Sequence, residues 1–128
     1  ASFIEWVQEQ PYANNTAIVL TGDHLGMQTS YYNAKITEPS YSRTLYNVII
    51  NPAIRPVSTS SRLFSSFDMY PTTLAALGVQ IEGDRLALGT NLFSDQPTLV
   101  EQYGNLENLN TELSKRSNFY EKNIFLAK

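Results

Sequence analysis

The sequence contains no cysteine and a single histidine, His24, among its 128 residues. The lack of cysteine excludes disulfide bonds, thiolate zinc sites and a cysteine nucleophile within these residues. No apolar run approaches the roughly 18 residues that a membrane-spanning helix requires, and the opening ASFIEWVQEQ lacks the pattern of a signal peptide. We therefore expect a soluble chain whose opening residues resemble the middle of a longer sequence.

The sequence also has no excess of basic charge, because it contains nine basic and twelve acidic residues and its net charge is -3. No basic stretch stands out, so we expect no nucleic-acid partner. Hydrophobic residues make up 42% of the chain and charged residues 16%, which is typical of a globular protein. The length favours one domain, or a fragment of one, over residues 1–128.

The first half of the chain alternates a helical pattern with two short apolar runs. Residues 2–10 carry apolar positions at helical spacing and end before Pro11. Thr16–Thr21 and Leu45–Ile50 are predicted strands buried on both faces, which is typical of parallel sheets flanked by helices. Residues 25–44 between them are predicted to be a long loop, with a short strand near 34–36. This order indicates an α/β fold.

The second half contains a helix with clear start and stop signals, SSFDMYPTTLAALGV. Its predicted capping residue, first-turn residue and terminator are Ser66 or Asp68, Pro71 and Gly78. Its predicted apolar face contains Met69, Leu74 and Leu77. Turns and a short strand are expected over 79–93, a capped helix ending at Gly104, and a surface helix from Asn108 to about Lys122.

The stretch AIVLTGDHLGM places Asp23 and His24 side by side just past the first predicted strand. Functional groups of open α/β sheets gather beyond the carboxyl ends of strands. A carboxylate and a neutral imidazole both bind divalent metals such as zinc or manganese, although the pair is also suited to capping or ordering a loop. A catalytic metal usually takes three protein ligands, and no second acidic cluster pairs with Asp23 and His24. The pattern predicts part of a metal site.

Three ordered motifs carry a resemblance to a known superfamily. TGDHLG after a strand, then YNVIINP, then SSFDMYPTTLAALGV resemble the C-terminal part of the alkaline-phosphatase/sulfatase superfamily. The later GDRLALGTNLFSDQPTLVEQYG and LNTELSKRSNFY resemble its bacterial phosphoglycerol transferase branch, which includes lipoteichoic acid synthases. The resemblance covers nearly the whole chain. It implies that the fold is the C-terminal portion of an alkaline-phosphatase-like sheet flanked by helices.

By this resemblance, Asp23 and His24 correspond to two metal ligands, with manganese expected and zinc or magnesium as alternatives. The remaining acidic ligand and the Thr or Ser nucleophile would lie upstream, in an N-terminal part absent from these residues. The parent enzyme would be membrane-anchored and act on the extracellular face of a bacterial membrane. It would move glycerol phosphate from phosphatidylglycerol to a cell-envelope glycan or polymer. The chain alone is expected to be inactive and to bind metal weakly.

Two other functions stay open. The chain is alternatively a fragment of a sulfatase or phosphoethanolamine transferase from the same superfamily, or a non-catalytic module that binds a partner or glycan. As a fragment it would expose an apolar sheet edge or face, and would therefore tend to self-associate.

Other polar and aromatic residues have structural explanations as well as functional ones. We expect Asp68 and Thr72 to cap and brace a helix. Arg62 would contact a phosphate or a carboxylate, and we favour a surface position. Lys35 and Arg43 would line an anionic headgroup site or carry solvated charge. The paired tyrosines Tyr31 and Tyr32 would pack the loop down or lie near lipid.

Overall fold

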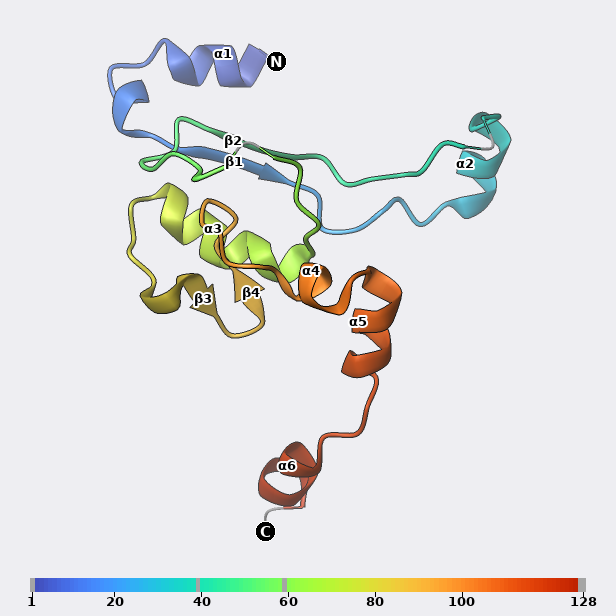
Figure 1. Cartoon of the computed structure of the whole chain (residues 1–128). Coiled ribbons are helices and arrows are strands. Elements are labelled where there is room, and N and C mark those ends of the chain that lie inside the picture. The colour runs from blue at the N-terminus through green and yellow to red at the C-terminus, as the bar shows by residue number, and fades with distance from the viewer. Residues whose placement is uncertain (1, 39, 59, 127–128) are drawn as a thin grey trace.

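The computed structural model describes residues 2–38, 40–58 and 60–126 as a mixed α/β chain with two small antiparallel sheets (Figure 1). The first half contains, in order, α1 (Ser2–Gln8), a 3-10 turn (Ala13–Asn15), β1 (Ile18–Thr21), α2 (Thr29–Lys35) and β2 (Asn47–Ile50). The second half contains a 3-10 turn (Ser66–Asp68), α3 (Met69–Ala76), a 3-10 turn (Glu82–Asp84), β3 (Arg85–Leu86), β4 (Gly89–Thr90), α4 (Leu99–Tyr103), α5 (Leu106–Leu113), α6 (Asn118–Tyr120) and a π-helical turn (Glu121–Phe125).

Both strands predicted in the first half are present, but the parallel pairing expected for them is wrong. β1 and β2 run antiparallel, with Ile18 opposite Ile50 and Thr21 opposite Asn47. The chain leaves the end of β1, extends outward and returns at the same end, where the N–H of Gly22 donates to the carbonyl of Tyr46. A parallel pair would need a crossover back to the start of β1, and this connection makes none.

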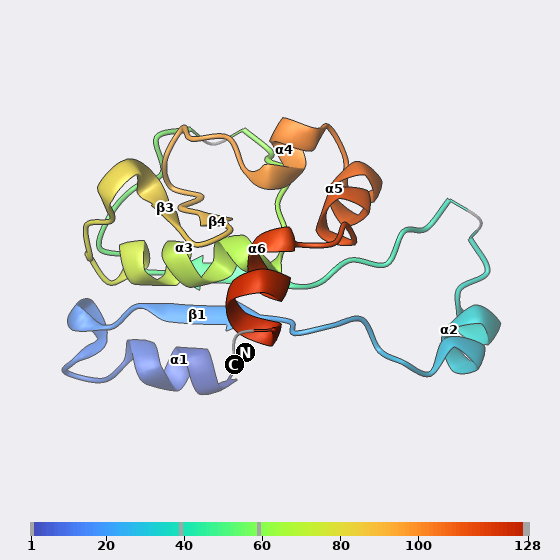
Figure 2. The same ribbon diagram turned by 90° about the horizontal axis from the view of Figure 1, so that it is seen from below.

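Helices flank this sheet on its two faces, as Figures 1 and 2 show with α1 on one side and α3 on the other. Side chains alternate along the strands, so Ile49 packs toward buried Ala75, Ala76 and Phe93. Ile18 and Ile50 face the other way and line a small cavity with Val7 of α1. Both strands are half-buried, less than predicted, and no further described strand pairs with their outer edges.

The connection between the two strands, residues 22–46, forms an arm that extends away from the sheet with α2 at its far end (Figures 1 and 2). A helix here corrects the predicted short strand near 34–36, because 34 and 35 lie in α2. The N-cap residue, Gln28, makes no side-chain capping bond. The sequence therefore carried no start signal of the kind that marks α4 and α5.

The segment 62–104, here called the helix–hairpin unit, packs α3 against the β3–β4 hairpin and also contains α4 (Figure 1). α3 has Pro71 in its first turn and ends at Gly78, whose φ of 84° is left-handed, so these two predictions are confirmed. The predicted apolar face is wrong at Leu77, which is exposed. Ala75 and Ala76 are buried in its place, because small side chains let α3 approach the sheet closely.

Glycine is required where the hairpin meets the start of α3. A Cβ on Gly89 would lie 2.0 Å from the carbonyl oxygen of Phe67. This close approach of two backbones fixes the hairpin against α3.

The C-terminal region differs from the single surface helix predicted from Asn108 to about Lys122. α5 ends at Leu113, and a separate short helical segment covers 118–125. Leu109 is the one buried side chain of α5. Among the described residues, no helix has both the length and the apolar composition that crossing a bilayer requires.

Candidate functional site

Asp23 and His24 lie together immediately beyond the end of β1, as the sequence predicted. The Nε2 atom of His24 is 3.5 Å from Oδ2 of Asp23. The other carboxylate oxygen, Oδ1, accepts the backbone N–H of His24 at 2.8 Å. This bond orients the carboxylate, so that Oδ2 and Nε2 form an adjacent pair of donor atoms.

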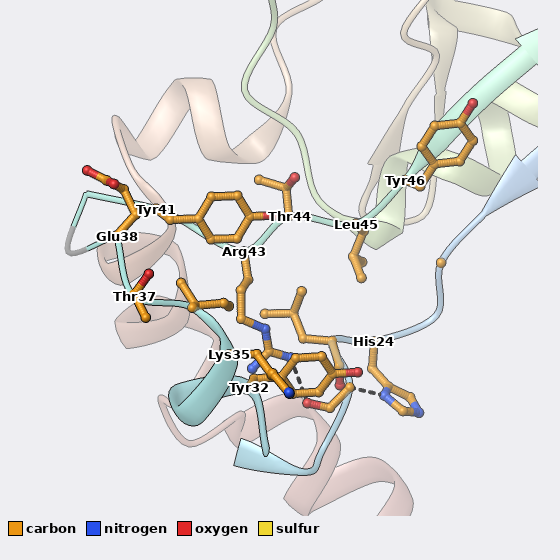
Figure 3. Close-up of a pocket in the computed structure, with 14 residues that line it drawn as sticks. His24, Tyr32, Lys35, Thr37, Glu38, Tyr41, Arg43, Thr44, Leu45 and Tyr46 are labelled. Atoms are coloured by element: carbon orange, nitrogen blue, oxygen red, sulfur yellow. Dashed lines mark hydrogen bonds between the residues drawn. The ribbon is translucent and has the colours of Figure 1, made fainter. Parts of the chain in front are cut away.

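The histidine ring is held by one further contact, shown as a dashed line in Figure 3. Nδ1 of His24 lies 2.9 Å from the backbone carbonyl oxygen of Leu25. A carbonyl oxygen can only accept a hydrogen bond, so Nδ1 carries the proton and donates it. In the neutral ring Nε2 then keeps its lone pair, which is the arrangement that metal-binding histidines adopt.

Both side chains face solvent, with exposed fractions of 58% for His24 and 87% for Asp23. Nothing in the described ranges completes a ligand set around them, because no group of three His, Asp or Glu side chains gathers there. The donor chemistry fits a divalent cation, but two donors are fewer than the three of a typical catalytic site. The arrangement is compatible with part of a metal site.

The arm forms a pocket of about 640 Å³ beside this pair (Figure 3). Gly22, His24 and Leu25 line its inner end, and Lys35 and Arg43 line it further out. Figure 3 shows Arg43, Tyr32 and Lys35 gathered together, with His24 to the side of this group. The sequence analysis had singled out all four residues, and the arm brings them to one cavity.

The two basic side chains that line the pocket, Arg43 and Lys35, differ in the contacts they make. The guanidinium of Arg43 lies over the ring of Tyr32, 4.1 Å from its centroid, and donates to the carbonyl of Gly26 at 2.6 Å. Lys35 makes no ion pair with a described residue. Tyr32 therefore packs the arm, with Tyr31 edge-on to it at 5.5 Å and more exposed. Arg43 therefore stabilises the arm through Tyr32 and Gly26, whereas the positive charge of Lys35 is not paired with a described acidic residue.

The motif DMYPT has the structural role that the sequence analysis favoured. Asp68 is 1% exposed, and its Oδ2 and Oδ1 accept the N–H groups of Ser65 and Thr90, each at 2.8 Å. The hydroxyl of Thr72 donates to the carbonyl of Asp68 and accepts the N–H of Leu92. Both side chains tie α3 to the hairpin. Asp68, one of the two predicted capping residues, occupies the N-cap position of α3 but makes no side-chain capping bond there. Ser65 and Asp68 instead form a capping box at the preceding 3-10 turn.

Arg62 contacts a carboxylate, as one of the two expectations had it, and it lies half-buried and not fully at the surface, with its side chain 15% exposed. Its Nη2 and Nε donate to Glu101 at 2.7 and 3.2 Å, and its other donors reach the carbonyls of Ser94 and Gln96. The hydrogen bond from Arg62 lowers the pKa of Glu101 and raises that of Arg62 itself. This pair is fully committed and unavailable to a ligand.

The sequence analysis did not identify Glu101 or three further residues that line the arm pocket, Glu38, Tyr41 and Tyr46. Glu101 had a readable signal, because Thr98 and Glu101 form a capping box at the start of α4. Glu38, Tyr41 and Tyr46 had no such signal, since they line the pocket only when the two sides of the arm lie together.

In comparisons with known proteins, no family model, no curated protein and no solved structure matches this chain.

Proposed function

We propose that this chain is the C-terminal part of a metal-dependent phosphoglycerol transferase of the alkaline-phosphatase/sulfatase superfamily. The enzyme would move glycerol phosphate from phosphatidylglycerol to a glycan or polymer at the outer face of a bacterial membrane. Asp23 and His24 would supply two of the ligands for a divalent cation, manganese in preference to zinc or magnesium. The rest of the site, including the Thr nucleophile, would belong to an upstream part of the same domain.

The observation that carries this proposal is the paired orientation of Asp23 Oδ2 and His24 Nε2. Two backbone contacts hold these donor atoms side by side and aim them at solvent. Oδ1 of Asp23 and Nδ1 of His24 bond the backbone of the turn and so also order this loop, which leaves Oδ2 and Nε2 as the atoms proposed to bind the cation. A bound cation would lower the pKa of a hydroxyl nucleophile and stabilise charge on phosphoryl oxygens.

The pocket supports the same function through its charge. Lys35 and Arg43 line the same pocket as His24. An anionic phosphodiester entering this pocket would gain electrostatic stabilisation from Lys35. Arg43 keeps the arm folded through Tyr32 and Gly26, which preserves the shape of the pocket.

The test joins this chain to the upstream part of its native gene and assays the longer protein. With manganese and a fluorescent phosphatidylglycerol, we expect release of the fluorescent diacylglycerol. Asp23→Asn and His24→Ala should each abolish turnover, whereas Glu9→Gln, at an exposed acid on the N-terminal side of the sheet, should not. An upstream sequence without a Thr nucleophile or an acidic ligand would refute the proposal. Turnover of a sulfate ester or phosphatidylethanolamine instead would assign the chain to another branch.

A further inference from the structure

The C-terminal segment 115–126 exposes large apolar side chains at high density. Five of the eight residues from 119 to 126 are large and apolar, and every one is more than half exposed: Phe119, Tyr120, Ile124, Phe125 and Leu126. Figure 1 shows α6 lying away from the sheets, connected to them through α5. Isolated exposed apolar residues need no explanation, but a cluster of this kind marks an interaction surface.

The charge of the chain is divided unevenly along its length. Residues 115–128 contain four basic residues and one acidic residue, whereas residues 1–114 contain five basic and eleven acidic residues. The apolar cluster is therefore attached to the one basic region of an otherwise acidic chain. Such asymmetry indicates a partner with negative charge.

The basic side chains of the segment are available to such a partner. Arg116 pairs with Glu121, and Lys115 pairs with Glu112, but Arg116 is 80% exposed and Lys115 is 63% exposed. Exposed pairs contribute little and exchange readily with other anions. Lys122 lies between Tyr120 and Ile124 and forms no ion pair with a described residue.

We propose that residues 115–126 dock on the surface of a bilayer that contains anionic lipid. Aromatic and aliphatic side chains around basic residues suit the boundary between headgroups and acyl chains. Phe119, Phe125 and Leu126 would enter this boundary, while Arg116 and Lys122 would contact lipid phosphates. The segment would bind at the surface and would not cross the bilayer, because its eight helical residues are too few to span a membrane.

The experiment measures binding of the chain to vesicles of phosphatidylcholine alone and of phosphatidylcholine with phosphatidylserine. Phosphatidylserine is chosen because the proposed donor substrate is a different lipid, so this test and the transferase assay can fail separately. We expect binding to the anionic vesicles only, weakened by salt. Phe125→Ser should lower the partition constant about tenfold, and Lys122→Gln about fivefold.

Matched controls lie elsewhere on the surface. Phe3→Ser removes an aromatic ring that is 66% exposed on α1, and Arg55→Gln removes an exposed charge; both should leave binding within about twofold. Circular dichroism should show that all variants stay folded. Equal binding to neutral vesicles, or Phe125→Ser binding as the parent does, would overturn the proposal. If the segment instead mediated self-association, Phe125→Ser would abolish a dimer of the chain and leave vesicle binding unchanged, which would also overturn the proposal.

Discussion

In the helix–hairpin unit, Asp68 is 1% exposed and both of its carboxylate oxygens accept backbone N–H groups. Beyond the end of β1, Asp23 is 87% exposed, and its polar contacts with described residues are both made with His24, through the backbone N–H and through Nε2. Both are aspartates at the end of an element in a sequence with few charges. Both carboxylate oxygens of Asp68 bond the backbone of the fold, whereas Oδ2 of Asp23 lies at the solvent-exposed side and is the oxygen proposed to bind a cation.

The same contrast separates the two regions as a whole. In the helix–hairpin unit, Arg62, Thr72 and Thr98 each join elements far apart in sequence. In the arm, by contrast, the described hydrogen bonds of Thr29 and Arg43 stay within residues 22–46. We infer that the helix–hairpin unit supplies most of the stability of the chain, whereas the proposed function would place its chemistry in the arm and the Asp23–His24 turn.

The largest effect should come from Asp68→Ala. The change leaves the buried N–H groups of Ser65 and Thr90 without acceptors, so we expect a loss of about 3 kcal/mol in the free energy of unfolding. Urea denaturation measures this loss. Asp23→Ala is the matched control and should cost less than about 0.5 kcal/mol. Equal losses for the two variants would contradict the division between the regions.

A smaller effect is expected for Thr72→Val, which keeps the side-chain shape but removes the hydroxyl. The buried N–H of Leu92 then loses its acceptor, at a cost of about 1–2 kcal/mol. Thr73→Val is the control in the same helix, since its hydroxyl only donates back to the carbonyl of Met69. A Thr73 variant as unstable as the Thr72 variant would show that helix propensity, and not the tie to the hairpin, sets the cost.

The Arg62–Glu101 pair should make the helix–hairpin unit sensitive to acid. Because the hydrogen bond from Arg62 holds the pKa of Glu101 below its ordinary value near 4.5, the stabilisation is present above about pH 4.5 and disappears as the pH falls through the lowered pKa. Glu101→Gln retains a capping acceptor for Thr98 but loses the charge. It should cost about 1 kcal/mol at neutral pH and flatten the stability profile below pH 5. An unchanged slope would contradict this assignment.

How far the sequence predicts this structure depends on how local the deciding interactions are. α3 was predictable because Pro71 and Gly78 mark its ends through their own backbone preferences. The antiparallel pairing of β1 with β2 was not, because it depends on where the arm returns. Leu77 was misplaced for a similar reason, since the packing of Ile49 and Phe93 selects the alanine face of α3.

The candidate site divides in the same way. Asp23 and His24 are adjacent in sequence, so their proximity was readable from the sequence. The contact between His24 and the Leu25 carbonyl depends on the backbone turn, and the pocket depends on both sides of the arm. Neither leaves a pattern in the sequence.

The most direct test of the central claim uses the fact that His24 is the only histidine. Its ring protons give isolated NMR signals, and bound Mn²⁺ broadens the signals of nearby protons. We predict selective broadening of the His24 signals during a manganese titration, with an affinity weaker than micromolar, abolished by Asp23→Asn and unaffected by Glu9→Gln. Signals that stay sharp, or that broaden equally without the Asp23 carboxylate, would contradict the claim that this pair is part of a metal site. A submicromolar affinity would contradict the claim that the site is incomplete.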